Sequence, residues 1–169
     1  RTLNDSTIAV TIGARKGTYK DMPANRHYTL KLVASTVPAS VKIDGTETAY
    51  TYDGNNLSVI IDIPDTDCAK EKTVTVTFPK DATPVADGLI GKFRHIQQGC
   101  IALKSSNPGF VFNEQLGTME STGIAISYAP QEAEQRIEAF RHNYANLKQV
   151  LVESGMEEAE ADKFIQKAY

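Results

Sequence analysis

The sequence predicts an α+β protein: an antiparallel, immunoglobulin-like β-sandwich over residues 1–82, followed by a helical domain of three to four helices over residues 83–169. Three observations support this prediction. In the first half, apolar and polar residues alternate in several short runs, which is typical of half-buried strands. An Asp-Gly pair separates two of these runs at the spacing of a β-hairpin. In the second half, apolar residues recur every three or four positions, as on one face of a helix.

Several segments of the first half have the pattern of strands or of two strands joined by a turn. They are residues 7–12, 27–35, 40–50, 57–63 and 72–78. Within residues 40–50, Asp44-Gly45 predicts a type I′ turn, because both central positions of that turn need a positive φ. A further turn is predicted at the DGNN sequence of residues 53–56. Short strands with turns at this spacing favour a small sandwich.

The second half is predicted to begin with a helix capped by Thr83, with Pro84 at its first position. The apolar face of this helix consists of Leu89, Phe93, Ile96, Cys100 and Leu103. We expect this face to dock on the sheet, because a unit of about 80 residues buries only a modest share of its surface by itself.

Three further helices are predicted beyond that one. A short helix over residues 113–122 is expected to end at Gly123, with residues 124–128 extended. The clearest helix begins at Pro130 and stops before Gly155, a residue type common at the C′ position. Its apolar stripe consists of Ile137, Phe140, Tyr144, Leu147 and Leu151. A last amphipathic helix carries Phe164, Ile165 and Ala168.

The composition is that of an ordinary soluble globular protein, with 41% hydrophobic and 23% charged residues. The formal net charge is −3, and neither half has a basic surplus: ten Lys/Arg stand against ten Asp/Glu in residues 1–82, and eight against eleven in residues 83–169. No apolar run approaches the roughly 20 residues of a membrane helix. We therefore expect neither a nucleic-acid partner nor a membrane partner.

The basic stretch RKGTYKDMPANRHY, residues 15–28, has three possible readings: a loop that binds phosphate or nucleic acid, a loop that binds sugar, or a polar crossover between strands. A phosphate cradle needs a Gly-rich turn at a helix N-terminus, whereas a strand is predicted here. We therefore interpret the stretch as a crossover. Gly17 is expected to permit an unusual backbone angle or a close approach of the chain. Tyr19 and Tyr28 are expected to cover the edge of the core, and Arg26 to tie the loop down by hydrogen bonds.

A series of short motifs between residues 7 and 78 occurs in a recognisable order. The motifs are Gly17-Thr18-Tyr19, Met22-Pro23, Arg26-His27-Tyr28, Pro38, Val41-Lys42-Ile43-Asp44-Gly45, Tyr52-Asp53-Gly54, Leu57-Ser58-Val59 and Val74-Thr75-Val76. Their order and spacing resemble the far C-terminal β-sandwich domain that follows the catalytic barrel in glycoside hydrolases of family 31, such as α-glucosidases and α-xylosidases. The chain departs from the pattern at Tyr50, where a tryptophan is expected.

The resemblance implies a non-catalytic accessory region whose partner is the catalytic barrel of a parent enzyme that hydrolyses α-glycosidic bonds. The two catalytic aspartates of that family lie on the barrel, and no aspartate here matches their motifs, so no catalytic residue is expected. The start at Arg1, without an initiating Met, is typical of an excised fragment. The parent is expected to be periplasmic or secreted. A protein-interaction sandwich, unrelated to these enzymes, is a further alternative.

Carbohydrate binding is the alternative with named residues. Tyr50 and Tyr52 stand two apart, so on one strand they would point the same way and could stack on a sugar ring. Packing at the sheet edge is the competing interpretation of the same pair. Exposure decides between them: two coplanar rings facing solvent would support sugar binding, and buried rings would not.

No metal or cofactor is expected. A calcium site is conceivable at Asp62, Asp65, Asp67 and Glu71, but their spacing misses the EF-hand pattern, and a solvated turn is the preferred interpretation. His27, His95 and His142 form no metal-ligand pattern. Cys68 and Cys100 are expected to be free thiols, with Cys100 facing a core.

Overall fold

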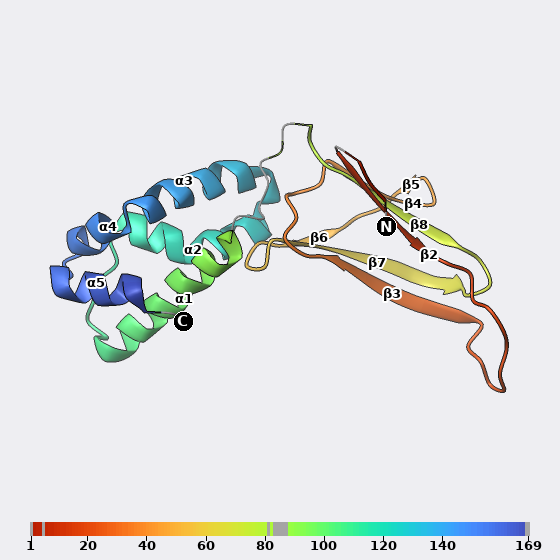
Figure 1. Ribbon diagram of the computed structural model, residues 1–169, viewed down its shortest axis with the longest axis horizontal. Helices are drawn as coiled ribbons and strands as arrows, with labels where there is room; N and C mark the ends of the chain where they lie inside the picture. The colour runs from red at the N-terminus through yellow and green to blue at the C-terminus, as the bar shows by residue number, and fades with distance from the viewer. Residues whose placement is uncertain (1, 5, 81, 83–87, 168–169) are drawn as a thin grey trace. The chain divides into compact units, whose positions relative to one another are not determined.

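The computed structural model describes residues 2–4, 6–80, 82 and 88–167, with only the backbone described for residues 2–4 (Figure 1). The chain forms two compact units. The β unit contains Arg1–Tyr52 and Ser58–Pro84, and the helical unit contains Asp53–Leu57 and Val85–Tyr169. The α+β class, with antiparallel sheets followed by helices, is as the sequence predicts. A domain boundary between residues 82 and 83 stays a prediction.

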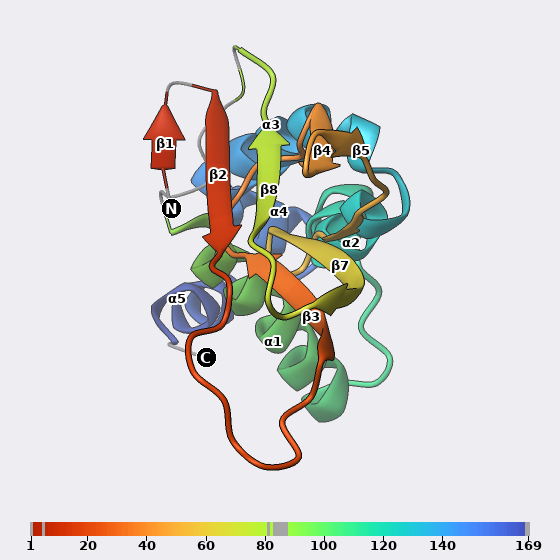
Figure 2. The same cartoon turned by 90° about the vertical axis from the view of Figure 1, so that its right-hand side faces the viewer.

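The β unit consists of two antiparallel sheets (Figure 2). The strands are β1 (Thr2–Asn4), β2 (Thr7–Ile12), β3 (Asn25–Leu32), β4 (Ser40–Ile43), β5 (Thr46–Glu47), β6 (Thr51–Asp53), β7 (Ser58–Asp67) and β8 (Lys72–Thr77). One sheet has the order β1-β2-β8-β4-β5, and the other has the order β3-β7-β6. Every pairing with a described register is antiparallel.

The alternating pattern places the core on one face of each central strand. In β7, Val59, Ile61 and Ile63 are buried, and in β8 Val74 and Val76 are fully buried. The residues between them on the strands are polar or less buried, as the period of two requires. The strands predicted at residues 7–12 and 72–78 agree with β2 and β8 to within one residue.

The Asp44-Gly45 hairpin forms as predicted. The φ angles are 48° at Asp44 and 83° at Gly45, so both central residues are left-handed, as a type I′ turn requires. Asp44 also holds the neighbouring strand, because its Oδ1 accepts the Thr73 amide at 2.9 Å and its Oδ2 accepts the Lys72 ammonium at 2.7 Å. These hydrogen bonds lower the pKa of the Asp44 carboxyl, with Lys72 as the larger cause.

Strand β7 is longer than the sequence predicts and runs to Asp67. Its pairing with β3 continues to Asn25 opposite Asp67, across a register shift between Arg26 and Tyr28. At that shift two residues of β7, Pro64 and Asp65, lie opposite one residue of β3. The extra residue makes a β-bulge, and bulges are among the few strand positions that accept proline. Pro64 therefore does not end the strand.

Over residues 88–167, the helical unit has five α-helices and a 3₁₀ turn, rather than the predicted three to four helices. They are α1 (Leu89–Ser106), α2 (Glu114–Tyr128), η1 (Pro130–Glu132), α3 (Ala133–Ala145), α4 (Leu147–Glu153) and α5 (Glu158–Gln166). The predicted long helix is divided at Asn146 into α3 and α4, and it ends before Gly155 as expected, with φ 90° at that glycine. Among the described residues, none of the helices is both long and apolar enough to cross a bilayer.

Helix α2 contradicts two predictions about its C-terminal half. It passes through Gly123 without ending, and residues 124–128 are helical rather than extended. Asn113 caps its N-terminus, since its side chain accepts the amide of Leu116 at 2.9 Å.

The apolar face of α1 packs inside the helical unit, and its docking on the sheet stays a prediction. The Phe93 ring meets the Phe140 ring of α3 edge to face, with centroids 4.5 Å apart. Gly99 lies against the Phe164 ring of α5. Leu89, Phe93, Ile96 and Cys100 are all almost fully buried. The predicted cap at Thr83 and Pro84 lies outside the described residues.

Candidate functional site

The two tyrosines proposed to stack on sugar do not form an exposed pair. Tyr52 is 2% exposed, and its hydroxyl donates to the Ser35 carbonyl at 2.6 Å. Tyr50 precedes β6 and is half-buried; its hydroxyl donates to the Pro38 carbonyl at 2.9 Å, and burial raises its pKa. The two hydroxyls therefore connect β6 and the residues just before it to the segment that follows β3. Sugar binding itself stays a prediction, but the geometry does not favour it at these rings.

The basic stretch of residues 15–28 is a strand crossover with a different anchor from the one expected. Gly17 has φ 79°, so of the two predicted alternatives the unusual backbone angle is the one that holds. Arg15, rather than Arg26, ties the loop: its Nη1 donates to the Pro23 carbonyl, and its amide donates to the Cys68 carbonyl, both at 2.8 Å. Tyr19 is 60% exposed, so it does not cover the core edge.

The acidic segment considered for calcium is divided between a strand and a turn. Asp62 and Asp65 lie on β7, and Asp62 accepts the Thr29 hydroxyl of β3 at 3.0 Å. Asp67 ends β7 and accepts the Ala69 amide at 2.9 Å. Within the described part of the chain, no group of three or more His, Cys, Asp or Glu side chains is placed to hold a metal ion. The preferred turn interpretation holds only for the last part of this segment.

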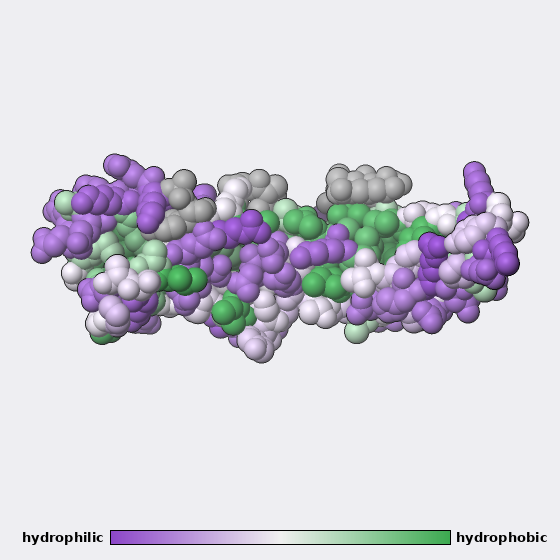
Figure 3. Space-filling model, turned by 90° about the horizontal axis from the view of Figure 1, so that it is seen from below, coloured by the Kyte–Doolittle hydropathy of each residue, from purple (hydrophilic) through white to green (hydrophobic). Residues whose placement is uncertain are grey.

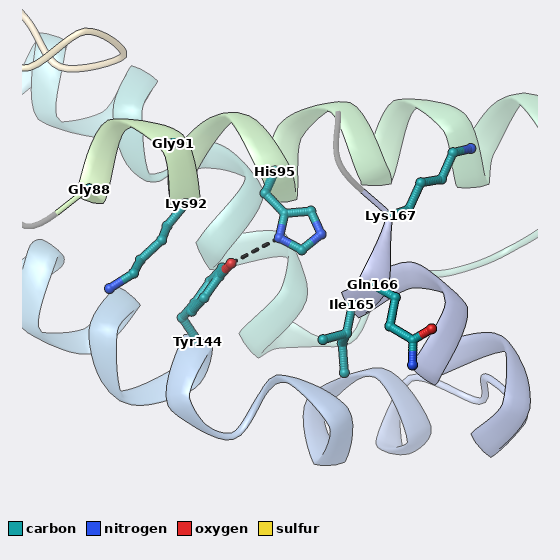
Figure 4. A pocket seen from close by; sticks show the side chains of 8 residues that line it. All are labelled: Gly88, Gly91, Lys92, His95, Tyr144, Ile165, Gln166 and Lys167. Atoms are coloured by element: carbon teal, nitrogen blue, oxygen red, sulfur yellow. Dashed lines mark hydrogen bonds between the residues drawn. The ribbon is translucent and has the colours of Figure 1, made fainter.

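A shallow pocket of about 410 Å³ opens in the helical unit beside His95 and Tyr144 (Figure 4). Its lining residues are Gly88, Gly91, Lys92, His95, Tyr144, Ile165, Gln166 and Lys167. The Lys92 ammonium lies 5.7 Å from the centre of the Tyr144 ring, a cation–π contact. Figure 4 shows the Lys92 and Lys167 side chains pointing in opposite directions, so their charges do not converge on one point.

His95 connects three helices through its two ring nitrogens. The Phe164 carbonyl of α5 can only accept, so Nε2–H donates to it at 3.0 Å. In the neutral ring, Nδ1 then accepts the hydroxyl of Tyr144 in α3 at 2.9 Å. Burial raises the pKa of Tyr144, which keeps that hydroxyl protonated. His95 therefore holds α1, α3 and α5 together.

One group of polar contacts in the helical unit was not found from the sequence. It surrounds the segment Asp53–Leu57, and we call it the glycine joint, defined by Gly54, Asn55, Gly123 and Ser127. The Gly54 amide donates to Ser127 Oγ at 2.8 Å, and Ser127 Oγ donates to the Gly123 carbonyl at 3.0 Å. The sequence feature that marks the glycine joint is Gly123 within the α2 pattern, which we interpreted as a helix end.

Polar side chains of α1 complete the glycine joint. Gln97 Nε2 donates to Asn55 Oδ1 at 2.8 Å, and Arg94 Nη2 donates to Asn56 Oδ1 at 3.0 Å. Asp53 in turn accepts the Asn56 amide and side chain, which closes the turn. These amide and guanidinium groups hold backbone in place, and none of them carries the chemistry of a nucleophile or a general base.

The two cysteines are free, as predicted, and both are buried. Cys100 is 1% exposed, and burial, with a smaller contribution from the charge of Glu120, raises its thiol pKa to about 12. The thiol is therefore protonated at neutral pH and unsuited to nucleophilic chemistry.

Comparisons with models of protein families, with curated proteins and with solved structures find no match to this chain. Function is therefore inferred from the geometry and from the resemblance of residues 7–78.

Proposed function

We propose that this chain is the non-catalytic C-terminal accessory region of a family 31-like glycoside hydrolase, and that it stabilises the catalytic barrel of the parent. In this proposal the two antiparallel sheets form an immunoglobulin-like β-sandwich, and the helices form an extension of it. The parent hydrolyses α-glycosidic bonds, whereas this region alone does not.

One observation supports the proposal: several of the resemblance motifs contribute residues to the core or to a turn. Val41, Tyr52 and Val59 are at most 2% exposed, and Asp44-Gly45 makes the β4–β5 turn. Residues that fill the core or form a turn stabilise the fold, as expected of a scaffold.

A truncation of the parent tests this proposal. The parent enzyme is compared with a variant that lacks residues 1–169, and three quantities are measured: soluble yield, midpoint of thermal unfolding, and kcat on an α-glycoside. We expect soluble yield and unfolding midpoint to fall much more than kcat of the enzyme that remains folded. A truncated parent that is equally soluble and equally stable would contradict the accessory role.

The sugar-binding alternative gives a different result. An amide NMR titration of the fragment with maltose, isomaltose and xyloglucan oligosaccharides would show clustered shifts near Tyr50 and Tyr52 if these rings bind sugar. Because Tyr52 is buried, we expect no such cluster at millimolar sugar.

A further inference from the structure

The sequence contains three Asp-Gly pairs: Asp44-Gly45, Asp53-Gly54 and Asp87-Gly88. In such a pair the glycine nitrogen can attack Cγ of the preceding aspartate, because glycine has no side chain to shield that nitrogen. The structure describes both residues of the first two pairs, whereas Asp87 lies outside the described residues. The first two pairs have very different surroundings, so the fold decides which of them can react.

The reaction needs only water. The glycine nitrogen bonds to Cγ and loses its proton, a carboxyl oxygen leaves as water, and a succinimide ring closes. Hydrolysis then takes up one water molecule. It restores aspartate when the bond between the nitrogen and Cγ breaks, and it gives isoaspartate when the bond between the nitrogen and the α-carbonyl carbon breaks. The protonated carboxyl is the reactive form, because a carboxylate has no hydroxyl to release.

The glycine joint prevents this attack at Asp53-Gly54. The Gly54 amide donates to Ser127 Oγ at 2.8 Å, and both carboxyl oxygens of Asp53 accept from Asn56. Gly54 is buried, and its backbone lies so close to α2 that an added Cβ would clash with the Gly123 carbonyl. Ring closure at this pair therefore requires the glycine joint to open.

The Asp44-Gly45 turn has few contacts of this kind. Both residues are exposed, and no atom lies within 4 Å of the position of a Cβ on Gly45. Strand β5 beyond the turn has two residues, both exposed, and its described register with β4 consists of two residue pairs. Hydrophilic residues also predominate at the right-hand end of the β unit in Figure 3, so water reaches this region. A turn with so little burial opens locally at low cost.

The Asp44 carboxyl itself is restrained by β8. It accepts the Lys72 ammonium and the Thr73 amide, so both hydrogen bonds must break before Cγ can reach the Gly45 nitrogen. The same hydrogen bonds lower the pKa of the carboxyl and so keep it in the unreactive, ionised form. We propose that Asp44-Gly45 is a site of spontaneous isoaspartate formation, which begins when β8 releases the Asp44 carboxyl, and that the glycine joint protects Asp53-Gly54.

Isoaspartate at residue 44 would change the hairpin. The chain then continues through Cβ, which adds one atom to the backbone of the turn. The length of a hairpin turn sets the register of its strands, here Ile43 opposite Thr46 and Lys42 opposite Glu47. We therefore expect the modified chain to lose the β4–β5 pairing, which amide NMR would detect as shifts at residues 42–48. This inference does not depend on the proposed accessory role.

Incubation of the full chain in heavy-oxygen water at mildly acidic pH tests the proposal. Each hydrolysis of a ring places one heavy oxygen atom at the residue that formed it, and fragment ions in mass spectrometry locate that label. We expect label to accumulate at Asp44 at least about tenfold faster than at Asp53, because the glycine joint costs more to open than the turn. In urea both pairs are unfolded, and the two rates should be similar.

The substitution Lys72→Met tests the restraint by β8. It keeps the aliphatic part of the side chain and removes the ammonium that Asp44 accepts. We expect labelling at Asp44 to become roughly two- to fivefold faster and labelling at Asp53 to stay unchanged. Lys42→Met is the matched control, since it removes the same charge from β4 and leaves the hydrogen bonds of Asp44 in place. Circular dichroism checks that both variants fold.

Labelling of the folded chain at Asp53 as fast as at Asp44, or faster, would overturn the proposal. So would the absence of label at Asp44 after a time in which the urea-unfolded chain is labelled there. Equal labelling rates of Lys72→Met and Lys42→Met at Asp44 would overturn the part of the proposal in which β8 restrains the carboxyl.

Discussion

At the scale of single residues, the glycine joint makes the sharpest prediction. A Cβ at Gly123 would lie 2.3 Å from Asn55 Oδ1 and 2.9 Å from Asn55 Cα, distances that real Cβ contacts do not reach. Because part of this clash is with backbone, a side-chain rotation cannot relieve it. We expect Gly123→Ala to lower the free energy of unfolding by roughly 1–3 kcal/mol, measured by chemical denaturation.

The matched control is Gly117→Ala in the same helix. The nearest atom to a Cβ there is Phe112 Cβ at 4.0 Å, which is ordinary contact. Replacing a helical glycine by alanine in open space gains up to about 1 kcal/mol, so this variant should be neutral or more stable. Equal effects of Gly123→Ala and Gly117→Ala would show that the glycine joint is looser than described.

Asp44 makes a prediction about pH. Hydrogen bonds from Lys72 and from the Thr73 amide lower the pKa of its carboxyl below the ordinary 3.8. A lowered folded-state pKa gives stability that is present above the unfolded pKa and is lost as the pH falls through the folded one. We therefore expect this contribution to disappear below about pH 4. An NMR titration of the Asp44 carboxyl measures the folded pKa directly, and a midpoint at or above 3.8 would contradict the argument.

The substitution Asp44→Asn separates the ion pair from the turn. Asn-Gly suits a type I′ turn as well as Asp-Gly does, so the hairpin should persist. The acid-dependent loss of stability should then be smaller in D44N than in the original chain, with Lys42→Gln as a charge control on β4.

At the scale of elements, the sequence predicts what short-range patterns determine. Alternation locates β2 and β8, and Asp44-Gly45 locates the hairpin, because both signals act between near neighbours in the chain. The length of α2 could not be predicted from such short-range signals. Gly123 resembles the end of a helix, but glycine fits this position because Asn55, which is far away in the sequence, lies close to it. The same limit applies to Tyr50 and Tyr52. Their spacing predicts a shared direction, but only the tertiary structure shows that Tyr52 points inward.

The docking of α5 depends on a second close approach. A Cβ at Gly99 of α1 would lie 2.3 Å from Phe164 Cζ, and Phe164 with Ala161 provides the buried surface of this nine-residue helix. We expect Gly99→Ala to displace the Phe164 ring and to speed amide hydrogen exchange in α5 more than in α2. Gly91→Ala, also in α1 but with open space around its Cβ, should not. Uniform exchange across both helices would show that α5 is held by other contacts.

At the scale of the whole molecule, the helical unit is not a continuous stretch of chain. It includes Asp53–Leu57, and Leu57 within that segment is fully buried. A fragment of residues 85–169 therefore lacks part of its own unit. Burial of a leucine contributes about 1.5–3 kcal/mol, and in a unit of this size each kcal/mol shifts the melting temperature by roughly 4–8 °C. We expect the helical signal of the fragment to melt roughly 10 °C below that of the full chain.

The substitution Gly123→Ala distinguishes this explanation from a general loss of stability. In the full chain its Cβ meets Asn55, so the substitution destabilises. In the fragment Asn55 is missing, and alanine only improves the helix, by about 1 kcal/mol. The effect on melting temperature should therefore change sign between the two proteins. A loss of similar size in both would mean that the segment 53–57 does not occupy the α2 surface in solution, and the fragment would then be a complete folding unit.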